Sequence, residues 1–333
     1  MNYRGKRFTL FVTVIILVLL CAGQALAAQK WKLGHVALPD SDNSYHAAAL
    51  KFKELLAEKT NIKITIFPQR QLGDDREMLE GVPTGLLDVT AATLGPVSAF
   101  EPKVGLLELP FLFNNLDHLD AVLDGSIGRE LLDSLEKAGY KGLGFFDDGI
   151  NNITNSKQPI HSAADFKGLQ MRTIEAPVRI AVAKSLGSNP VPVAYSELYT
   201  ALQTGVVDGQ SNPNWVISSR SLWEVQKYVS VTNHIWGGAV LVMNLEKFND
   251  LSPQEQELVL AAGKEACQYG RKMGRNAEDK HLQKAIDHGM IVDKTPDLAS
   301  MRKATASVYD DIYRDQPTWK PVIEEIHQLG QKF

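Results

Sequence analysis

The chain has 333 residues, of which 44% are hydrophobic, 22% charged and 8% aromatic, a composition typical of a globular protein and not of a disordered one. This length favours two domains, because single hydrophobic cores rarely grow beyond about 250–300 residues. With 35 Lys and Arg against 39 Asp and Glu, the formal net charge of -4 provides no electrostatic footprint for nucleic acid, which excludes DNA or RNA as the main partner.

Residues 1–27 have the pattern of a cleaved secretory signal peptide. Three basic residues precede an apolar run over 8–20, and Ala-Leu-Ala at 25–27 supplies a small-x-small cleavage signal. A membrane anchor is the alternative, but the run is shorter than the roughly 20 residues that a spanning helix needs. Cleavage would remove the three positive charges and no negative ones, taking the net charge from -4 to -7. It would leave Cys267 as the single cysteine, so we expect an exported protein without an intrachain disulfide.

The first part of the mature chain predicts an α/β unit. Residues 31–36 and 62–66 have strand patterns, and apolar residues at helical spacing lie between them, so the three form a βαβ unit. A helix that begins at Asp74 and a buried strand over 86–93 follow. We therefore expect a parallel sheet with crossover helices.

The middle of the chain predicts a second sheet. A helix over 128–138 leads to a strand over 141–146 and then to a polar segment over 151–156. The elements expected after it are, in order, a short helical turn between Ser162 and Gly168, a strand over 169–173, a helix ending near Gly187, a helix over 196–204, a strand over 206–208 and a helix over 214–228.

The clearest local signal is the start of a long helix at Ser252. Ser252, Pro253 and Glu255 combine an N-cap, a proline at the first helical position and a capping-box glutamate. The helical pattern continues toward Ala285, beyond the length of a typical globular helix, which predicts a helix that runs along both domains.

Motifs of common catalytic and cofactor sites are missing from the sequence. There is no HExxH, GxSxG, P-loop or CxxC motif, and no two of the eight histidines have the i,i+4 spacing of a zinc pair. Gly142 and Gly144 lack the third glycine of a dinucleotide fingerprint, and residues 40–44 lack the later glycine and glutamate of a calcium loop. We expect no metal and no cofactor. An exported α/β protein of this kind fits a binding protein whose ligand lies at the carboxyl ends of strands.

Six sequence strings carry a specific resemblance. They are KGLQMR at 167–172, AYSELYTALQTG at 194–205, VDGQSNP at 207–213, QLGDDRE at 71–77, LPFLF at 109–113 and TNH at 232–234. Together they resemble the DctP family, the periplasmic solute receptors of TRAP (tripartite ATP-independent periplasmic) transporters, over nearly the whole mature chain.

The resemblance implies two α/β domains that close on a ligand like a hinge. Domain I would comprise residues 28–149 and 237–278, and domain II residues 150–236 and 279–333, with chain crossings near Gly149, Trp236 and Glu278. It also implies a monomer that docks on the membrane subunits of a TRAP permease.

The family's signature ligand contact maps onto Arg172, the arginine of the KGLxxR string. A guanidinium can grip a carboxylate through two parallel hydrogen bonds, which is worth most in a closed cleft. By the same resemblance Asn212 supplies a neutral donor and acceptor, and Tyr195 lies against the ligand. The alternatives are a turn residue for Asn212 and core packing for Tyr195.

Other candidates are less specific. Trp215 and Trp236 stand beside motif positions, where an aromatic wall and core packing are both open. Glu175 follows the Arg172 strand and either faces the cleft or starts a helix in solvent. The remaining candidates are Thr93, which ends the third predicted strand, and Asn151.

One departure from the family concerns the ligand's charge. Many relatives carry a second arginine shortly after the glycine at the start of the second domain, but here the segment is Gly-Ile-Asn-Asn at 149–152. A second cation is therefore expected to be missing, which argues for one carboxylate on the ligand.

The predicted function is that of a periplasmic receptor that delivers a small monocarboxylate to a TRAP permease. A sugar acid and an aromatic amino or keto acid are both open. The rival functions are a receptor that serves a sensor protein and a secreted enzyme, and the second lacks any catalytic constellation.

Overall fold

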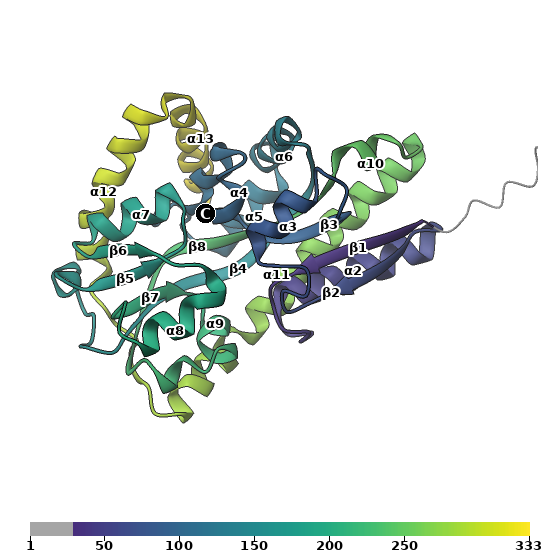
Figure 1. Ribbon diagram of the computed structural model, residues 1–333. Helices are drawn as coiled ribbons and strands as arrows, with labels where there is room; N and C mark the ends of the chain where they lie inside the picture. Colours follow the sequence, from purple (N-terminus) through teal and green to yellow (C-terminus); the bar gives the residue numbers. More distant parts are fainter. Residues whose placement is uncertain (1–28) are drawn as a thin grey trace, which may run out of the picture.

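The computed structural model describes residues 29–333, and its strands join edge to edge in one mixed sheet of nine strands (Figure 1). The predicted signal peptide lies outside the described residues. The strand order is β2-β1-β3-β8-β4-β7-β5-β6, and β9 pairs with β8. The strands are β1 (Lys30–His35), β2 (Lys63–Phe67), β3 (Val89–Thr93), β4 (Tyr140–Asn155), β5 (Gln170–Thr173), β6 (Asn189–Pro192), β7 (Gly209–Asn212), β8 (Tyr228–Asn244) and β9 (Ile291–Asp293).

Helices and short 3-10 turns connect these strands and flank the sheet. The α-helices are α2 (Ser44–Lys59), α3 (Asp75–Gly81), α4 (Leu94–Val97), α5 (Leu116–Asp124), α6 (Ser126–Ser134), α7 (Pro177–Ser185), α8 (Leu198–Gln203), α9 (Asn214–Ser219), α10 (Leu245–Asn249), α11 (Pro253–Asp287), α12 (Leu298–Asp315) and α13 (Lys320–Gly330). The 3-10 helices are η1 (Pro102–Glu108), η2 (Leu135–Ala138), η3 (Ala163–Phe166), η4 (Tyr195–Glu197), η5 (Leu222–Glu224) and η6 (Pro317–Trp319).

The first part of the chain confirms the predicted α/β unit. Strands β2, β1 and β3 pair in parallel, and α2 and α3 connect them. Helix α2 begins after Asn43, whose side chain accepts a hydrogen bond from the Tyr45 amide. The strands β1 and β3 therefore end at the same edge of the sheet, where their following loops meet.

The prediction of a separate second sheet is wrong, because β4 and β8 run through both halves of the molecule and join them. The predicted strand over 141–146 and the polar segment over 151–156 are one strand, β4, which pairs with β8 antiparallel over nearly its whole length. Its register shifts near Gly142, Gly149 and Ile153. Each bulge breaks the alternation of side chains, so the sequence shows fragments where the backbone is continuous.

Two elements after β5 also differ from the prediction. The strand lies at Gly209–Asn212 and not over 206–208; Val206 is exposed, while Gln210 is fully buried between neighbouring strands. Buried amides that satisfy one another carry no hydrophobic signal, which explains the shift. The predicted helix over 214–228 ends at Ser219, because Ser221 takes a left-handed conformation and β8 starts at Tyr228.

The long helix α11 is confirmed at both ends. Ser252 and Glu255 form the predicted capping box, and the helix continues for 35 residues to Asp287 (Figure 1). It packs on α2, β4 and α9. Gly270 permits a close crossing with α2, since a Cβ there would lie 2.7 Å from Ser44 O. Cys267 points inward and is buried against Gly144 of β4, and burial raises the pKa of its thiol to about 12.

Within residues 29–333, no helix combines the length and the apolar character needed to cross a lipid bilayer.

Candidate functional site

A cavity of about 480 Å³ lies at the ends of strands from both halves of the sheet. One half holds β1, β2 and β3, the other holds β5, β6 and β7, and β4 and β8 run between them. Val36 and Thr93 reach it from the ends of β1 and β3, and Ile174, Val193 and Asn212 from the ends of β5, β6 and β7. Ligands of α/β folds bind at this kind of edge. The whole lining is Val36, Tyr45, Asp74, Asp75, Arg76, Thr93, Pro96, Ser98, Ala99, Asp148, Arg172, Ile174, Glu175, Pro177, Arg179, Pro192, Val193, Ala194, Tyr195, Asn212, Trp215 and Val216.

Arg172 is the most informative side chain of this lining. It is only 2% exposed, and its Nε donates a 3.0 Å hydrogen bond to Val193 O, which fixes the guanidinium at the end of β5. Its Nη2 has no hydrogen-bond partner among the described residues. Burial and the nearby Arg179 lower its pKa to about 10. A buried cation with open donors is costly, so this position favours an anionic ligand group.

A second guanidinium lines the cavity, which corrects the expectation that a second cation is missing. Arg179 on α7 is buried, and its Nη2 lies 2.5 Å from Oε1 of the buried Glu108. Glu108 compensates the charge of Arg179, although Arg179 Nε has no hydrogen-bond partner in residues 29–333. Arg179 could not be identified from the sequence, because it lies on a helix and not in the segment at 149–152, where relatives carry their second arginine.

Two buried carboxyl groups, Asp75 and Asp148, face the cavity and were not among the predicted residues. Thr93 donates from its hydroxyl and its amide to Asp75 Oδ2, while Asp75 Oδ1 has no partner among the described residues. Tyr45 Oη donates to Asp148 Oδ1 over 3.1 Å. Burial raises the pKa of each carboxyl to about 7, and the negative charge of Asp148 contributes to the raised pKa of Asp75. Asp75 lies in the QLGDDRE string, one of the six that carry the family resemblance, and this string is the sequence feature that could have identified it as a site residue.

Tyr195, Asn212 and Trp215 lie in the lining, as their prediction requires. Asn212 Nδ2 donates to Gln210 Oε1, and this pair belongs to a buried chain of amides and hydroxyls that holds it in place. Trp215 Nε1 donates to Asp148 O over 2.6 Å, so the ring is fixed beside the acidic side of the cavity. Tyr195 stacks under Arg220, with 4.2 Å between the guanidinium carbon and the ring centroid.

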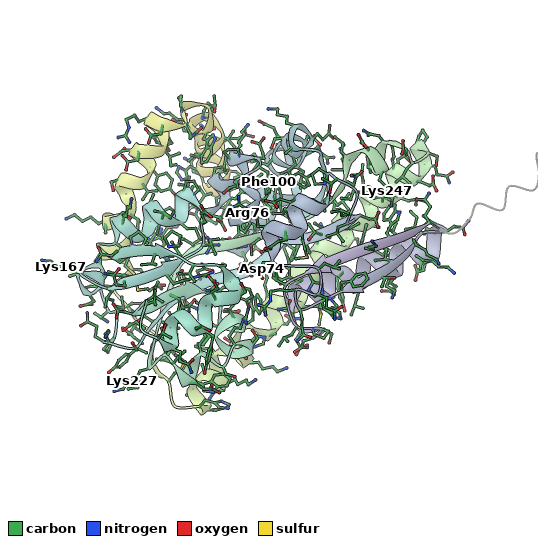
Figure 2. The ribbon with its side chains drawn as sticks, in the orientation of Figure 1. Asp74, Arg76, Phe100, Lys167, Lys227 and Lys247 are labelled. Atoms are coloured by element: carbon green, nitrogen blue, oxygen red, sulfur yellow. The ribbon has the colours of Figure 1, made fainter. Side chains whose placement is uncertain are left out.

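Thr93 and Glu175 reach the cavity in different ways. Thr93 lines it and holds Asp75. The Glu175 side chain is 79% exposed, and its carboxylate lies 3.5 Å from Nη1 of Arg76 on α3. Asp74 and Arg76 also line the cavity, and both are labelled near the middle of the view in Figure 2. Glu175 therefore belongs to the rim.

Trp236 and Asn151 do not line the cavity, so neither is placed to contact a ligand in it. Trp236 is buried with its Nε1 donating to Asp147 Oδ1 over 2.9 Å, and it packs edge-on against Phe113. Asn151 is fully buried and donates to Ser211 Oγ. Both lie at the middle of the β4–β8 pair, and Asn151 Oδ1 has no hydrogen-bond partner in residues 29–333.

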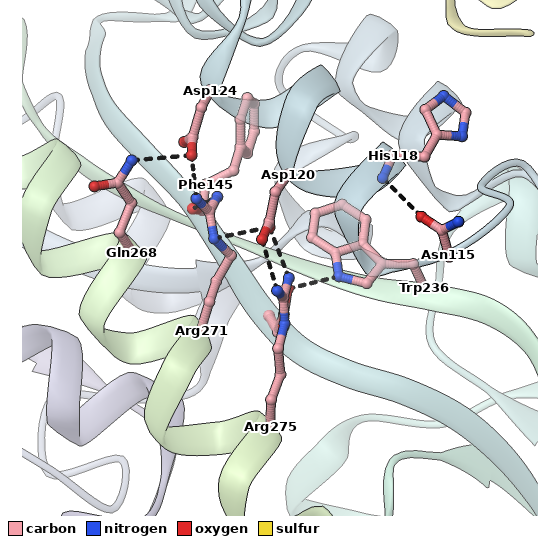
Figure 3. Close-up of polar contacts among 10 residues, drawn as sticks. Asn115, His118, Asp120, Asp124, Phe145, Trp236, Gln268, Arg271 and Arg275 are labelled. Atoms are coloured by element: carbon pink, nitrogen blue, oxygen red, sulfur yellow. Dashed lines mark hydrogen bonds and ion pairs between the residues drawn. The ribbon is translucent and has the colours of Figure 1, made fainter. Parts of the chain in front are cut away.

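A network of ion pairs lies behind the cavity and attaches α11 to α5 and β4 (Figure 3). Arg275 forms two 2.8 Å hydrogen bonds to Asp120 and a 2.5 Å hydrogen bond to Asp147. Arg271 pairs with Asp124 over 2.5 Å. Asp147 directly precedes Asp148, so this network supports the acidic side of the cavity.

No group of three or more His, Cys, Asp or Glu side chains in the part of the chain that the structure describes is arranged to hold a metal ion.

Comparisons with known proteins give a consistent result. The family described as bacterial extracellular solute-binding protein, family 7 (DctP), matches residues 33–316. The 2,3-diketo-L-gulonate-binding periplasmic protein of Escherichia coli K12 is 32% identical over 332 residues, covering 99% of this chain and all of that protein.

Two solved structures are similar at 34% identity, each covering 90% of this chain and 98% of the other chain. One is a TRAP periplasmic solute-binding protein from Polaromonas sp. JS666 bound to D-erythronate, with a TM-score of 0.85. The other is a TRAP periplasmic solute-binding protein from Bordetella whose electron density was assigned to pantoate, with a TM-score of 0.84.

Proposed function

Since the chain belongs to the DctP family of bacterial extracellular solute-binding proteins, we propose that it captures a small hydroxylated monocarboxylate at Arg172 and delivers it to a TRAP permease. The observation that carries this proposal is the buried guanidinium of Arg172, whose Nη2 is unpartnered in residues 29–333 and lines the cavity. A carboxylate there would form charge-assisted hydrogen bonds in a site shielded from water.

The lining supports one carboxylate on the ligand, surrounded by polar groups. Arg179 is paired with Glu108 and the exposed Arg76 with Glu175, so Arg172 is the guanidinium of the described lining that has no ion pair. The lining also carries Asp75 and Asp148, which would repel a second carboxylate when ionised and would offer it no positive charge when protonated. Erythronate and pantoate, the ligands of the two similar structures, are both monocarboxylates with hydroxyl groups.

A sugar acid or related hydroxy acid fits better than an aromatic amino or keto acid. The aromatic alternative relied on Tyr195, Trp215 and Trp236 enclosing a ring, but Trp236 packs outside the lining. The two carboxyl groups offer hydrogen bonds to hydroxyls.

The proposed mechanism is closure of two domains, residues 28–149 with 237–278 and residues 150–236 with 279–333. Gly149 and Gly237 are paired in the middle of β4 and β8, where these domains would meet. Gly149 has a φ of +138°, and a Cβ there would lie 2.6 Å from Pro213 Cβ, so the crossing needs glycine. A ligand held from both sides would favour the closed form.

Residues 1–27 would direct export to the periplasm, and the receptor would act as a monomer without a cofactor.

A thermal-shift screen followed by calorimetry tests the function. The screen contains aldonates, uronates, D-erythronate, pantoate, aromatic amino acids and succinate, and a ligand at 100 times its Kd should stabilise the protein by about 2.7 kcal/mol. We expect hydroxylated monocarboxylates to give the largest shifts, and Arg172→Ala to weaken their binding at least about 100-fold, because charged hydrogen bonds are lost.

Arg314→Ala is the matched control, because Arg314 is exposed on α12. Circular dichroism should show both variants folded. Unchanged affinity in folded Arg172→Ala, or a preference for succinate, would contradict the proposal.

A further inference from the structure

The buried charges around the cavity do not balance. Five ionisable side chains there are at most 8% exposed: the cations Arg172 and Arg179, and the anions Glu108, Asp75 and Asp148. If all were ionised, the negative charges would outnumber the positive ones before any ligand bound. A ligand carboxylate at Arg172 would add another, and uncompensated charge away from water is costly.

Asp75 and Asp148 are the two buried carboxyl groups that would reduce this excess of negative charge by binding a proton. Asp75 accepts two hydrogen bonds from Thr93 but leaves Oδ1 without a partner in residues 29–333, and no salt bridge to either carboxylate occurs there. Asp148 accepts one hydrogen bond from Tyr45, while the nearby Arg179 is committed to Glu108. Burial raises the pKa of both carboxyls to about 7, so a neutral form is within reach near neutral pH.

Apart from Glu278, the other titratable groups near the pair do not change charge in this range. Burial raises the pKa of Tyr45 and Tyr195 above 10 and lowers that of His234 to about 3, so all three stay neutral. Among the charged neighbours, Asp147 pairs with Arg275 on α11, Glu175 pairs with Arg76 at the exposed mouth, and Asp74 lies near Arg70.

Two further groups lie near the cavity but outside it. Glu278 on α11 lines a second cavity of about 180 Å³, which Asp148 also lines. Burial raises the pKa of Glu278 to about 7, so it titrates in the same range as the pair, and the Asn variants below separate its contribution. A 3.1 Å hydrogen bond joins the rings of His35 and His46, and burial lowers the pKa of each. None of these belongs to the lining.

We propose that Asp75 and Asp148 take up a proton when a monocarboxylate binds at Arg172, so that ligand capture is linked to protonation of these two carboxyl groups of the same cavity. This inference rests on the proposed function. A protonated carboxyl both donates and accepts hydrogen bonds, so the pair would match hydroxyl groups while cancelling the added negative charge. Capture would then be tightest below neutral pH.

Calorimetry with purified mature protein tests the proposal. D-erythronate, pantoate and D-glucuronate are titrated at pH 6.5, 7.0 and 8.5, in two buffers of different ionisation enthalpy at each pH. We expect uptake of up to about one proton per ligand at pH 7.0, because the unliganded pair is then about half protonated. Affinity should be at least about tenfold weaker at pH 8.5 than at pH 6.5.

Asp148→Asn and Asp75→Asn separate this proton linkage from other effects. Each variant keeps the shape of the side chain but cannot titrate, so proton uptake should fall by about half and affinity should depend less on pH. Glu77→Gln is the matched control, because Glu77 is an exposed carboxylate on the same helix as Asp75 and lies outside the lining. It should retain the wild-type proton uptake.

The outcomes distinguish this proposal from the function on which it rests. Binding without buffer-dependent heat and with constant affinity from pH 6.5 to 8.5 would overturn the proton linkage and leave the receptor function standing. Failure of all three acids to bind at any pH would refute the proposed ligand class and the proton linkage with it. If the Asn variants do not fold, the wild-type measurement alone decides.

Discussion

The Asp148 carboxyl lies on β4 between the hydrogen bond from Tyr45 and the indole of Trp215, which binds its backbone oxygen. Its burial raises its pKa from 3.8 to about 7, which makes the folded state hold a proton that the unfolded chain would release. A raised carboxyl pKa contributes stability that is fully present below pH 3.8 and is lost as pH rises through about 7.

Asp148→Asn should therefore change how stability depends on pH. Relative to the variant, the wild type should lose on the order of 3 kcal/mol of unfolding free energy between pH 4 and pH 7, and little more above pH 8. Urea unfolding of both proteins at pH 4.5, 6, 7 and 8 measures this difference, with Glu77→Gln as control. Stability curves that stay parallel across this range would show that Asp148 does not carry the shifted proton.

The sequence predicted one side of the site better than the other. Arg172, Asn212 and Tyr195 belong to recognisable strings at strand ends, and the structure brings them into one lining. Asp148 and Arg179 could not be identified in this way, because each is held in the site by a residue distant in sequence. Tyr45 donates a hydrogen bond to Asp148, and Glu108 pairs with Arg179. The excess of negative charge is likewise a property of burial, which composition does not reveal.

Helix α11 shows how one element supports the site from behind. Its Arg275 joins Asp120 of α5 to Asp147 of β4, and the buried indole of Trp236 donates to the same Asp147. Asp147 is only 5% exposed, so its carboxylate depends on these donors. Removal of the guanidinium would leave a buried anion with one hydrogen bond from Trp236.

Arg275→Met should destabilise the protein by about 2–4 kcal/mol, because it leaves Asp147 buried beside an apolar side chain. Urea unfolding at pH 7 measures the loss. The control is Lys280→Met on the same helix, where the ion pair with Asp42 is exposed and should contribute nothing measurable. Equal stability of both variants would argue that the α11 network does not hold the helix to β4.

A helix whose first residues carry a clear capping motif could be predicted from the sequence, whereas a strand without a hydrophobic pattern could not. The capping box at Ser252 predicted the start of α11 correctly, because it depends only on local hydrogen bonds. Strand β7 was misplaced by three residues, because its sequence Gly-Gln-Ser-Asn is polar and its burial comes from pairing with β4 and β5. Tertiary pairing therefore outweighed hydrophobic pattern there.

At the scale of the whole molecule, the two halves are joined by paired strands and a helix. Across the mouth of the cavity, Arg76 contacts Glu175, and the Arg70 guanidinium lies 5.6 Å from the Tyr195 ring centroid. Both contacts connect residues before β3 to residues after β5, so they form only when the mouth is narrow. The first contact is exposed, and contacts of these two kinds each contribute only about 1 kcal/mol or less at an exposed site.

Ligand binding should therefore make the molecule more compact in solution. We expect small-angle X-ray scattering to give a smaller radius of gyration with saturating D-erythronate than without it, and no change for Arg172→Ala at the same concentration. Identical scattering of the free and saturated wild type, at a concentration where calorimetry shows full occupancy, would contradict the hinge mechanism.

The position of Cys267 makes such movements accessible to spectroscopy. Maleimides react with thiolates, and a thiol that is buried under Gly144 with a pKa of about 12 presents almost none at neutral pH. Two engineered surface cysteines, one on each side of the mouth, can therefore carry a fluorescent donor and acceptor while the native thiol remains unlabelled. Opening and closing of single receptors could then be followed in real time without replacing a core residue.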